Sequence, residues 1–168
     1  MFAVASLLGG CAALGNLFNI GNGPVLVEQA AAANDCRSKL AHDSVTVLPT
    51  PAAVGQLQLQ RGFRLTFPGP LPDGPYVLVD VVPSADHARG LVVSRQAQIY
   101  KNVLYLTATY LPELGTPPVG TPCVLVAIPP GRYQQVEVSD PSGKRRALGS
   151  VSPAAESVEV THRHQAAD

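Results

Sequence analysis

Few residues in this chain have side chains whose types and spacing could carry out chemistry. Ser84, Asp86 and His87 stand together in "PSADHARG". A nucleophile, its base and the group that orients the base usually converge from separate parts of a fold, so such close neighbours predict a turn. The chain also lacks the G-x-S-x-G turn that exposes a catalytic serine in many hydrolases. We therefore expect no serine nucleophile in this loop.

Asp80 is a second acidic residue that could take part in catalysis, because it interrupts the apolar run "YVLVDVV". A buried carboxylate can have a raised pKa and act as an acid or a base. We expect Asp80 instead to face solvent or to pair with an arginine such as Arg64 or Arg95. An alternative remains a small secreted hydrolase with a carboxylate–His site. That site would be drawn from Asp80, Asp86, His87 and His42.

Two further groups could bind ions. His162 and His164 are two residues apart, a spacing that places both on one face of a strand. No third metal ligand is fixed by the sequence, so we expect a solvated tail. Lys144, Arg145 and Arg146 follow a turn, and we expect them to form a charged hairpin arm that protects a sheet edge. We predict no metal and no cofactor.

The charge balance excludes one class of partner. The 168 residues carry 12 Lys and Arg and 12 Asp and Glu, so the formal net charge is zero. Nucleic-acid-binding domains usually carry a basic patch, and this composition gives no reason to expect one. Tyr100, Tyr105 and Tyr110 are five residues apart, so on strands they alternate between faces and form no stacking platform. We predict no nucleic acid partner.

The amino-terminal segment is free of charge up to Glu28. An apolar run, Phe2–Leu8, is followed by Gly9, Gly10 and Cys11, and this stretch resembles the lipobox of bacterial lipoproteins. The resemblance implies a signal segment at residues 1–11 and lipidation of Cys11. The alternatives are a plain secretory signal or a buried apolar helix. Glycine and asparagine interrupt the segment, which disfavours a transmembrane helix.

The chain has three cysteines, an odd number for an exported protein. Lipidation of Cys11 would leave Cys36 and Cys123, and we predict a disulfide between them. The alternative is two unpaired thiols, with Cys123 buried as a small apolar side chain.

Period-two patterns and turn signals predict an all-β fold. In "QLQLQRGFRLTF" the residues Leu57, Leu59, Phe63, Leu65 and Phe67 share one parity, which predicts a half-buried strand or a bent pair of strands. Further strands are expected in "YVLVDVV", "LVVSRQAQIY", "NVLYLTATYL", "CVLVAI" and "YQQVEV". Turns are expected at Lys101-Asn102 and at residues 140–143. This pattern favours an antiparallel sandwich or a partly open barrel, with no convincing amphipathic helix.

The predicted organisation has four parts. Residues 1–11 form the signal segment and residues 12–41 a tether with a short helical piece. Residues 42–160 form the antiparallel β domain, and residues 161–168 form a tail.

Residues 90–143 contain a series of short elements in a fixed order: Pro112, Gly115, Thr121-Pro122-Cys123, Ile128-Pro129 and Val136-Glu137-Val138. On these elements the segment resembles the carboxyl-terminal domain of the PrcB-like protease-complex subunits of bacteria. The resemblance implies an exported, non-enzymatic β domain that associates with a surface protease.

These observations predict a non-catalytic lipoprotein of the bacterial cell envelope, in the periplasm or on the outer membrane, with a binding or scaffolding role. A contact with an envelope protein partner is expected in the proline-rich loop Leu111–Pro122, because loops on a rigid scaffold often carry binding function. The contact residues proposed there are Leu114, Gly115, Thr116, Pro117 and Pro118. The alternatives are the secreted hydrolase already described and a periplasmic carrier of an apolar ligand.

Overall fold

The structure is a computed structural model of the whole chain, and it describes residues 22–36, 43–72, 74–81, 88–112, 121–131 and 133–151. Several predicted features lie outside these residues. They are the signal segment with Cys11, the histidines His42, His87, His162 and His164, the residues Ser84 and Asp86, and the loop residues 114–118. Among the described residues, no helix is long and apolar enough to span a membrane.

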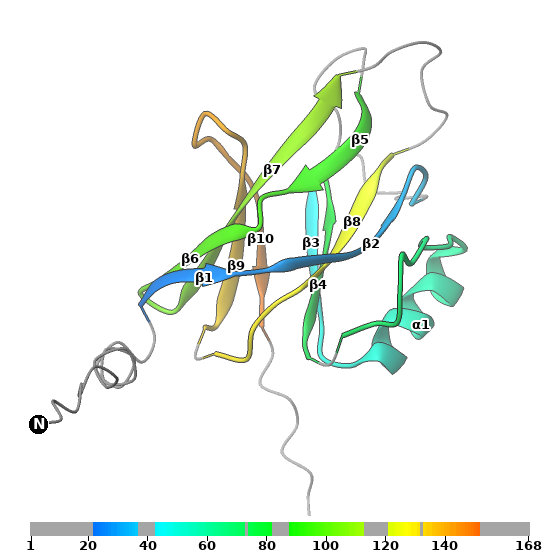
Figure 1. Cartoon of the computed structure of the whole chain (residues 1–168), viewed down its shortest axis with the longest axis horizontal. Helices are drawn as coiled ribbons and strands as arrows, with labels where there is room; N and C mark the ends of the chain where they lie inside the picture. The colour runs from blue at the N-terminus through cyan, green and yellow to red at the C-terminus, as the bar shows by residue number, and fades with distance from the viewer. Residues whose placement is uncertain are drawn as a thin grey trace, which may run out of the picture.

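The described chain folds into two β-sheets that pack face to face (Figure 1), which confirms the predicted all-β sandwich. The six-stranded sheet contains β1 (Gly23–Leu26), β5 (Ala88–Val93), β6 (Gln96–Tyr100), β7 (Val103–Pro112), β9 (Gln135–Ser139) and β10 (Arg145–Ser150). The four-stranded sheet contains β2 (Glu28–Ala33), β3 (Ser44–Leu48), β4 (Tyr76–Asp80) and β8 (Cys123–Ala127). Neighbouring strands are antiparallel, except that β7 and β9 run parallel. The arrangement is open rather than closed.

The central strands of the four-stranded sheet, β4 and β8, are buried on both faces. Their continuous apolar sequences are typical of such strands. Val77 and Val79 of β4 face the core between the sheets, where they pack with Leu104 and Leu106 of β7. Leu78 belongs to a second apolar cluster on the opposite face of the four-stranded sheet. This second cluster must be shielded from solvent by another element.

The element that shields this cluster is a helix, α1 (Pro51–Arg61), and the prediction of a strand through Leu57 and Leu59 is wrong. The helix starts because Thr50 caps it, accepting a hydrogen bond from the Ala53 backbone N–H at 3.2 Å. It ends at Gly62, which adopts the left-handed conformation. Figure 1 shows α1 on the side of the four-stranded sheet that faces away from the six-stranded sheet.

The predicted tether at residues 12–41 is also wrong where the structure describes it. Residues 23–26 form β1 and residues 28–33 form β2, and the two strands run almost in line from one sheet to the other (Figure 1). β1 pairs with β6, and β2 pairs with β8. This segment therefore joins the two layers of the sandwich, and its backbone hydrogen bonds compensate for its weakly apolar composition.

Two predicted connections are confirmed. Lys101 and Asn102 both have positive φ and join β6 to β7 as a two-residue hairpin turn. Asp140 organises the turn from β9 to β10, because its carboxylate accepts hydrogen bonds from the backbone N–H groups of Ser142 and Lys144.

Candidate functional site

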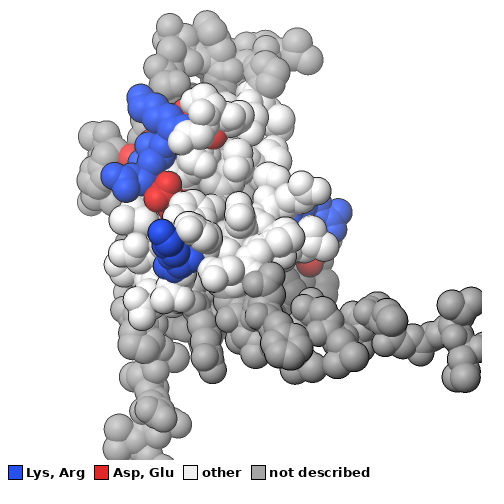
Figure 2. Space-filling view, turned by 90° about the vertical axis from the view of Figure 1, so that its left-hand side faces the viewer, with Lys and Arg blue, Asp and Glu red and all other residues white. Residues whose placement is uncertain are grey.

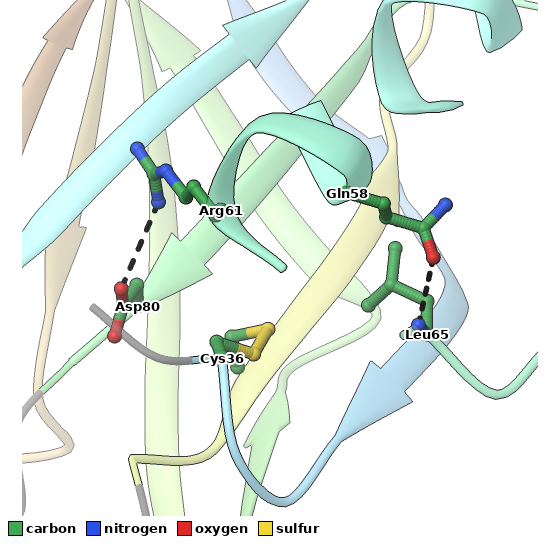
Figure 3. Close-up of a disulfide and its surroundings, with 6 residues drawn as sticks. Cys36, Gln58, Arg61, Leu65 and Asp80 are labelled. Carbon is green, nitrogen blue, oxygen red and sulfur yellow. Dashed lines mark hydrogen bonds and ion pairs between the residues drawn. A yellow bond between two sulfur atoms is a disulfide. The ribbon is translucent and has the colours of Figure 1, made fainter. Parts of the chain in front are cut away.

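Asp80 is the fully buried acidic residue at the end of β4, with no exposed surface. Its side chain lies on the same face of the sheet as Leu78, beneath α1. The guanidinium of Arg61, the last residue of α1, lies 3.9 Å from the Asp80 carboxylate (Figure 3). The expectation that Asp80 faces solvent is therefore wrong. The expected alternative, an arginine partner, is confirmed, but the partner is Arg61 rather than Arg64 or Arg95, because the helix brings this arginine over the strand.

Arg61 is held in place by two elements. Its guanidinium also donates a hydrogen bond to the Thr46 hydroxyl on β3 at 3.3 Å. The arginine thus joins the end of α1 to two strands of the four-stranded sheet. Enclosed ion pairs of this kind fix the position of an element, and they are weak evidence for catalysis.

A disulfide between Cys36 and Cys123 lies next to this pair and confirms the predicted bridge (Figure 3). The two Cα atoms are 5.9 Å apart, and both residues are buried. Cys123 is the direct register partner of Asp80 in the β4–β8 pair. The bridge ties the end of the β2 segment to β8, and a backbone hydrogen bond from the Cys36 N–H to the Thr121 carbonyl reinforces it at 2.9 Å.

Several ionisable side chains elsewhere in the described chain make structural contacts. Burial raises the pKa of Tyr133 to about 12, and its hydroxyl donates to the Pro129 carbonyl at 2.6 Å. Burial also raises the pKa of Tyr110, whose hydroxyl donates to the Val81 carbonyl. The hydrogen bond to Asp43, 2.7 Å long, raises the pKa of Arg146. The hydrogen bond from the Ser142 hydroxyl lowers the pKa of Asp140.

Metal binding finds no support in the part of the chain that the structure describes, where no three His, Cys, Asp or Glu side chains are grouped together. Asp80 is the one member of the hydrolase alternative inside the described residues. Asp86, His87 and His42 lie outside the described residues, so the hydrolase alternative stays a prediction.

A hollow of about 740 Å³ lies on the outer face of the six-stranded sheet. It is lined by eight residues of β1, β6 and β7, which are Pro24, Val25, Leu26, Gln96, Ala97, Gln98, Tyr105 and Thr107. Six of them alternate with core residues along their strands and face away from the core between the sheets, whereas Ala97 belongs to that core and Val25 packs against it. A volume of this size is typical of ligand sites.

Sequence reasoning missed this hollow, although part of the signal was present. Gln96 and Gln98 alternate with the buried Ala97 and Ile99, which is the pattern of a strand with one polar face. The sequence does not show that β1 pairs with β6 and completes the wall, because the paired residues Leu26 and Gln96 are 70 positions apart in the chain.

A second hollow, of about 590 Å³, lies beside α1. It is lined by helix residues including Gln58 and Leu59 and by the segment after the helix, including Phe63 and Arg64. The Gln58 side chain accepts a hydrogen bond from the Leu65 backbone N–H at 2.8 Å, which folds that segment back against the helix (Figure 3).

Comparisons with known proteins add no further guide: no family model, curated protein or solved structure matches this chain. The resemblance of residues 90–143 to the PrcB-like domain stays a prediction.

Proposed function

We propose that this chain is an exported, non-catalytic binding domain of the bacterial cell envelope, held at the membrane by a lipid on Cys11. It binds an envelope protein through the loop that follows β7, and the PrcB-like resemblance suggests a surface protease as that partner.

The buried Cys36–Cys123 disulfide is the observation that carries the proposal. Disulfides persist in oxidising compartments and are rare in the reducing cytosol. The bridge also lies where it can strengthen a binding scaffold, because Cys123 begins β8, directly after the proline-rich loop.

The ends of that loop are anchored, which supports a binding role. β7 reaches Pro112 with β5 paired along its last residues, from Ala108 to Pro112. On the other side of the loop, Thr121 accepts a hydrogen bond from Cys36 and Cys123 forms the disulfide. A loop between two fixed ends has less conformational entropy to lose when it binds.

Two measurements test the proposal. Mass spectrometry of the native protein is expected to find an acylated Cys11 as the new amino terminus. An intact Met1 in protein purified from its own cells would contradict the lipid anchor.

The second measurement is photo-crosslinking in cells. A photo-reactive amino acid in place of Thr116 is expected to give a covalent adduct with an envelope protease. The same group in place of Gln56, an exposed residue of α1, is the matched control and is expected to give none. Identical adducts at both positions, or none at Thr116, would rule out the loop as the contact.

A further inference from the structure

We propose that the hollow on the outer face of β1, β6 and β7 binds a neutral saccharide chain. This site is separate from the protein contact proposed above. The hollow uses the first half of β7, through Tyr105 and Thr107, whereas the loop follows the end of that strand at Pro112.

The lining side chains form two rows across the sheet. In the first row, Pro24 of β1 is the register partner of Gln98 of β6, and Gln98 is the partner of Tyr105 of β7. In the second row, Leu26 is the partner of Gln96. Thr107 stands two residues after Tyr105 and so shares its face. Successive rows on a strand are about 7 Å apart.

Both rows place an apolar side chain on the edge strand β1 and an amide on β6. The first row continues to Tyr105 on β7, and the Thr107 hydroxyl lies on the same face of β7, at a residue whose backbone carbonyl accepts a hydrogen bond from the Ser94 N–H. The two amides are exposed, and Tyr105 and Thr107 are half-buried. A repeating surface of this kind suits a ligand that itself repeats.

The absence of charged side chains from the lining favours an uncharged ligand. The eight lining residues include no Asp, Glu, Lys, Arg or His. The charged residues next to them are of opposite sign: Arg95 precedes Gln96, and Glu137 is the register partner of Tyr105. Phosphate and carboxylate ligands are recognised by grouped cations, which this lining lacks.

The wider surface has the same character on the side that Figure 2 shows. There the Lys and Arg side chains gather toward the two sides of the molecule, and uncharged surface lies between them.

A neutral saccharide matches the uncharged amide, hydroxyl and apolar side chains that line the hollow. Amides and hydroxyls both donate and accept hydrogen bonds, as sugar hydroxyls do. The C–H face of a pyranose ring needs apolar surface beside those groups. Leu26, whose side chain is 73% exposed, supplies it together with Pro24 and the ring of Tyr105.

A peptide added as a strand fits this place less well. β1 is an outer strand of its sheet and is only four residues long. One of the four is Pro24, which has no backbone N–H to donate to an added strand. A protein occupant is therefore an outcome that the experiment must separate from a saccharide.

Isothermal titration calorimetry of the full chain against three neutral probes, maltohexaose, cellohexaose and chitohexaose, tests the proposal. At least one is expected to bind, and an anionic oligogalacturonate is not. The double variant Gln96→Ala/Gln98→Ala is expected to raise the Kd about tenfold, since each amide loses its hydrogen bonds to the sugar. Gln56→Ala/Gln60→Ala is the matched control on exposed positions of α1, and it is expected to leave the Kd unchanged.

Three results would overturn the proposal. None of the neutral probes binds, the two double variants bind equally well, or the oligogalacturonate binds as tightly as the neutral chains. Co-sedimentation of the full chain with isolated envelopes distinguishes a protein occupant of the hollow from a saccharide. If digestion of the envelopes with a protease removes all binding that depends on Gln96 and Gln98, the occupant is a protein and the saccharide assignment is wrong.

Discussion

At the scale of single residues, several buried or partly buried ionisable groups hold elements together. Asp80 is enclosed beneath α1 with Arg61 beside it, and Arg146 reaches across to Asp43, 103 residues away in the chain. Tyr110 and Tyr133 bury their rings and donate their hydroxyls to backbone carbonyls. Such contacts set the positions of strands and loops, and each can be tested by its effect on stability.

The first prediction concerns Arg61. Arg61→Ala removes an ion-pair partner of a fully buried carboxylate, and we expect it to lower the free energy of unfolding by about 2 kcal/mol. The loss is smaller than the roughly 3–5 kcal/mol of a fully enclosed pair because Arg61 is partly exposed and the pair is long. Urea denaturation measures the change. Arg64→Ala, at an exposed neighbouring position, is the control and should change stability by less than about 0.5 kcal/mol. Equal losses for both would show that the pair has no specific role.

The second prediction concerns alkaline pH. Tyr133 has a folded-state pKa of about 12, above the value of about 10 expected in the unfolded chain. Its contribution to stability is therefore complete below pH ~10 and is lost as the pH rises from ~10 to ~12. We expect Tyr133→Phe to be less stable than the wild type at neutral pH and to lose less stability across this window. Denaturation midpoints measured at a series of pH values would contradict this if the two proteins followed parallel curves.

At the scale of the elements, α1 is specified by its ends more than by its pattern. Thr50 caps the first turn and Gly62 supplies the left-handed residue that ends the helix. Leu59 is 85% exposed, so the alternation of Leu57 and Leu59 does not mark a buried face. Val54 and Leu57, three residues apart, pack on the cluster beneath the helix.

Substitution by alanine should change the stability in opposite directions at two glycines in this region. Gly62 has φ +69°, and Gly62→Ala should cost about 1 kcal/mol because alanine avoids that conformation. Gly55 is inside the helix with open space around a Cβ, and Gly55→Ala should stabilise the protein by about 1 kcal/mol. Thermal unfolding followed by circular dichroism measures both. A change of the same sign for the two variants would refute the assigned helix end.

At the scale of the whole molecule, contacts distant in sequence hold the sandwich closed. The β1–β2 segment joins the two sheets, and the disulfide links residues 87 positions apart. Gly149 of β10 lies against Val45 of β3, where a Cβ would be 2.9 Å from the Val45 carbonyl oxygen. The strands at this corner can approach each other because Gly149 has no side chain.

Removing the disulfide should have the largest effect of these changes. The bridge closes a loop of 87 positions, and restricting such a loop in the unfolded chain corresponds to about 4 kcal/mol. We expect Cys36→Ala/Cys123→Ala to lose about that amount in urea denaturation while keeping the β-sheet signal in circular dichroism. As a check, the reduced wild type, denatured in urea under reducing conditions, should have the same free energy of unfolding as the variant. A double variant as stable as the oxidised wild type would show that the bridge adds nothing.

Features that depend on neighbours along the chain could be predicted from the amino-acid sequence alone. The apolar runs of β4 and β8 require burial on both faces, and Lys101-Asn102 and Asp140–Gly143 suit tight turns, so these elements could be predicted locally. The all-β class follows from them. The pairing of Cys36 with Cys123 could be predicted by counting cysteines and assigning Cys11 to a lipid.

Features that depend on distant partners follow from the folded arrangement of the strands and the helix, and no local pattern predicts them. Residues 57–61 become helical because a cluster on the four-stranded sheet needs a cover, and this helix brings Arg61, rather than Arg64 or Arg95, to Asp80. The weakly apolar residues 23–33 become strands because β6 and β8 offer them backbone hydrogen bonds. The row of Pro24, Gln98 and Tyr105 exists only once β1, β6 and β7 are in register, because side chains on different strands meet through pairing and not through their order in the chain.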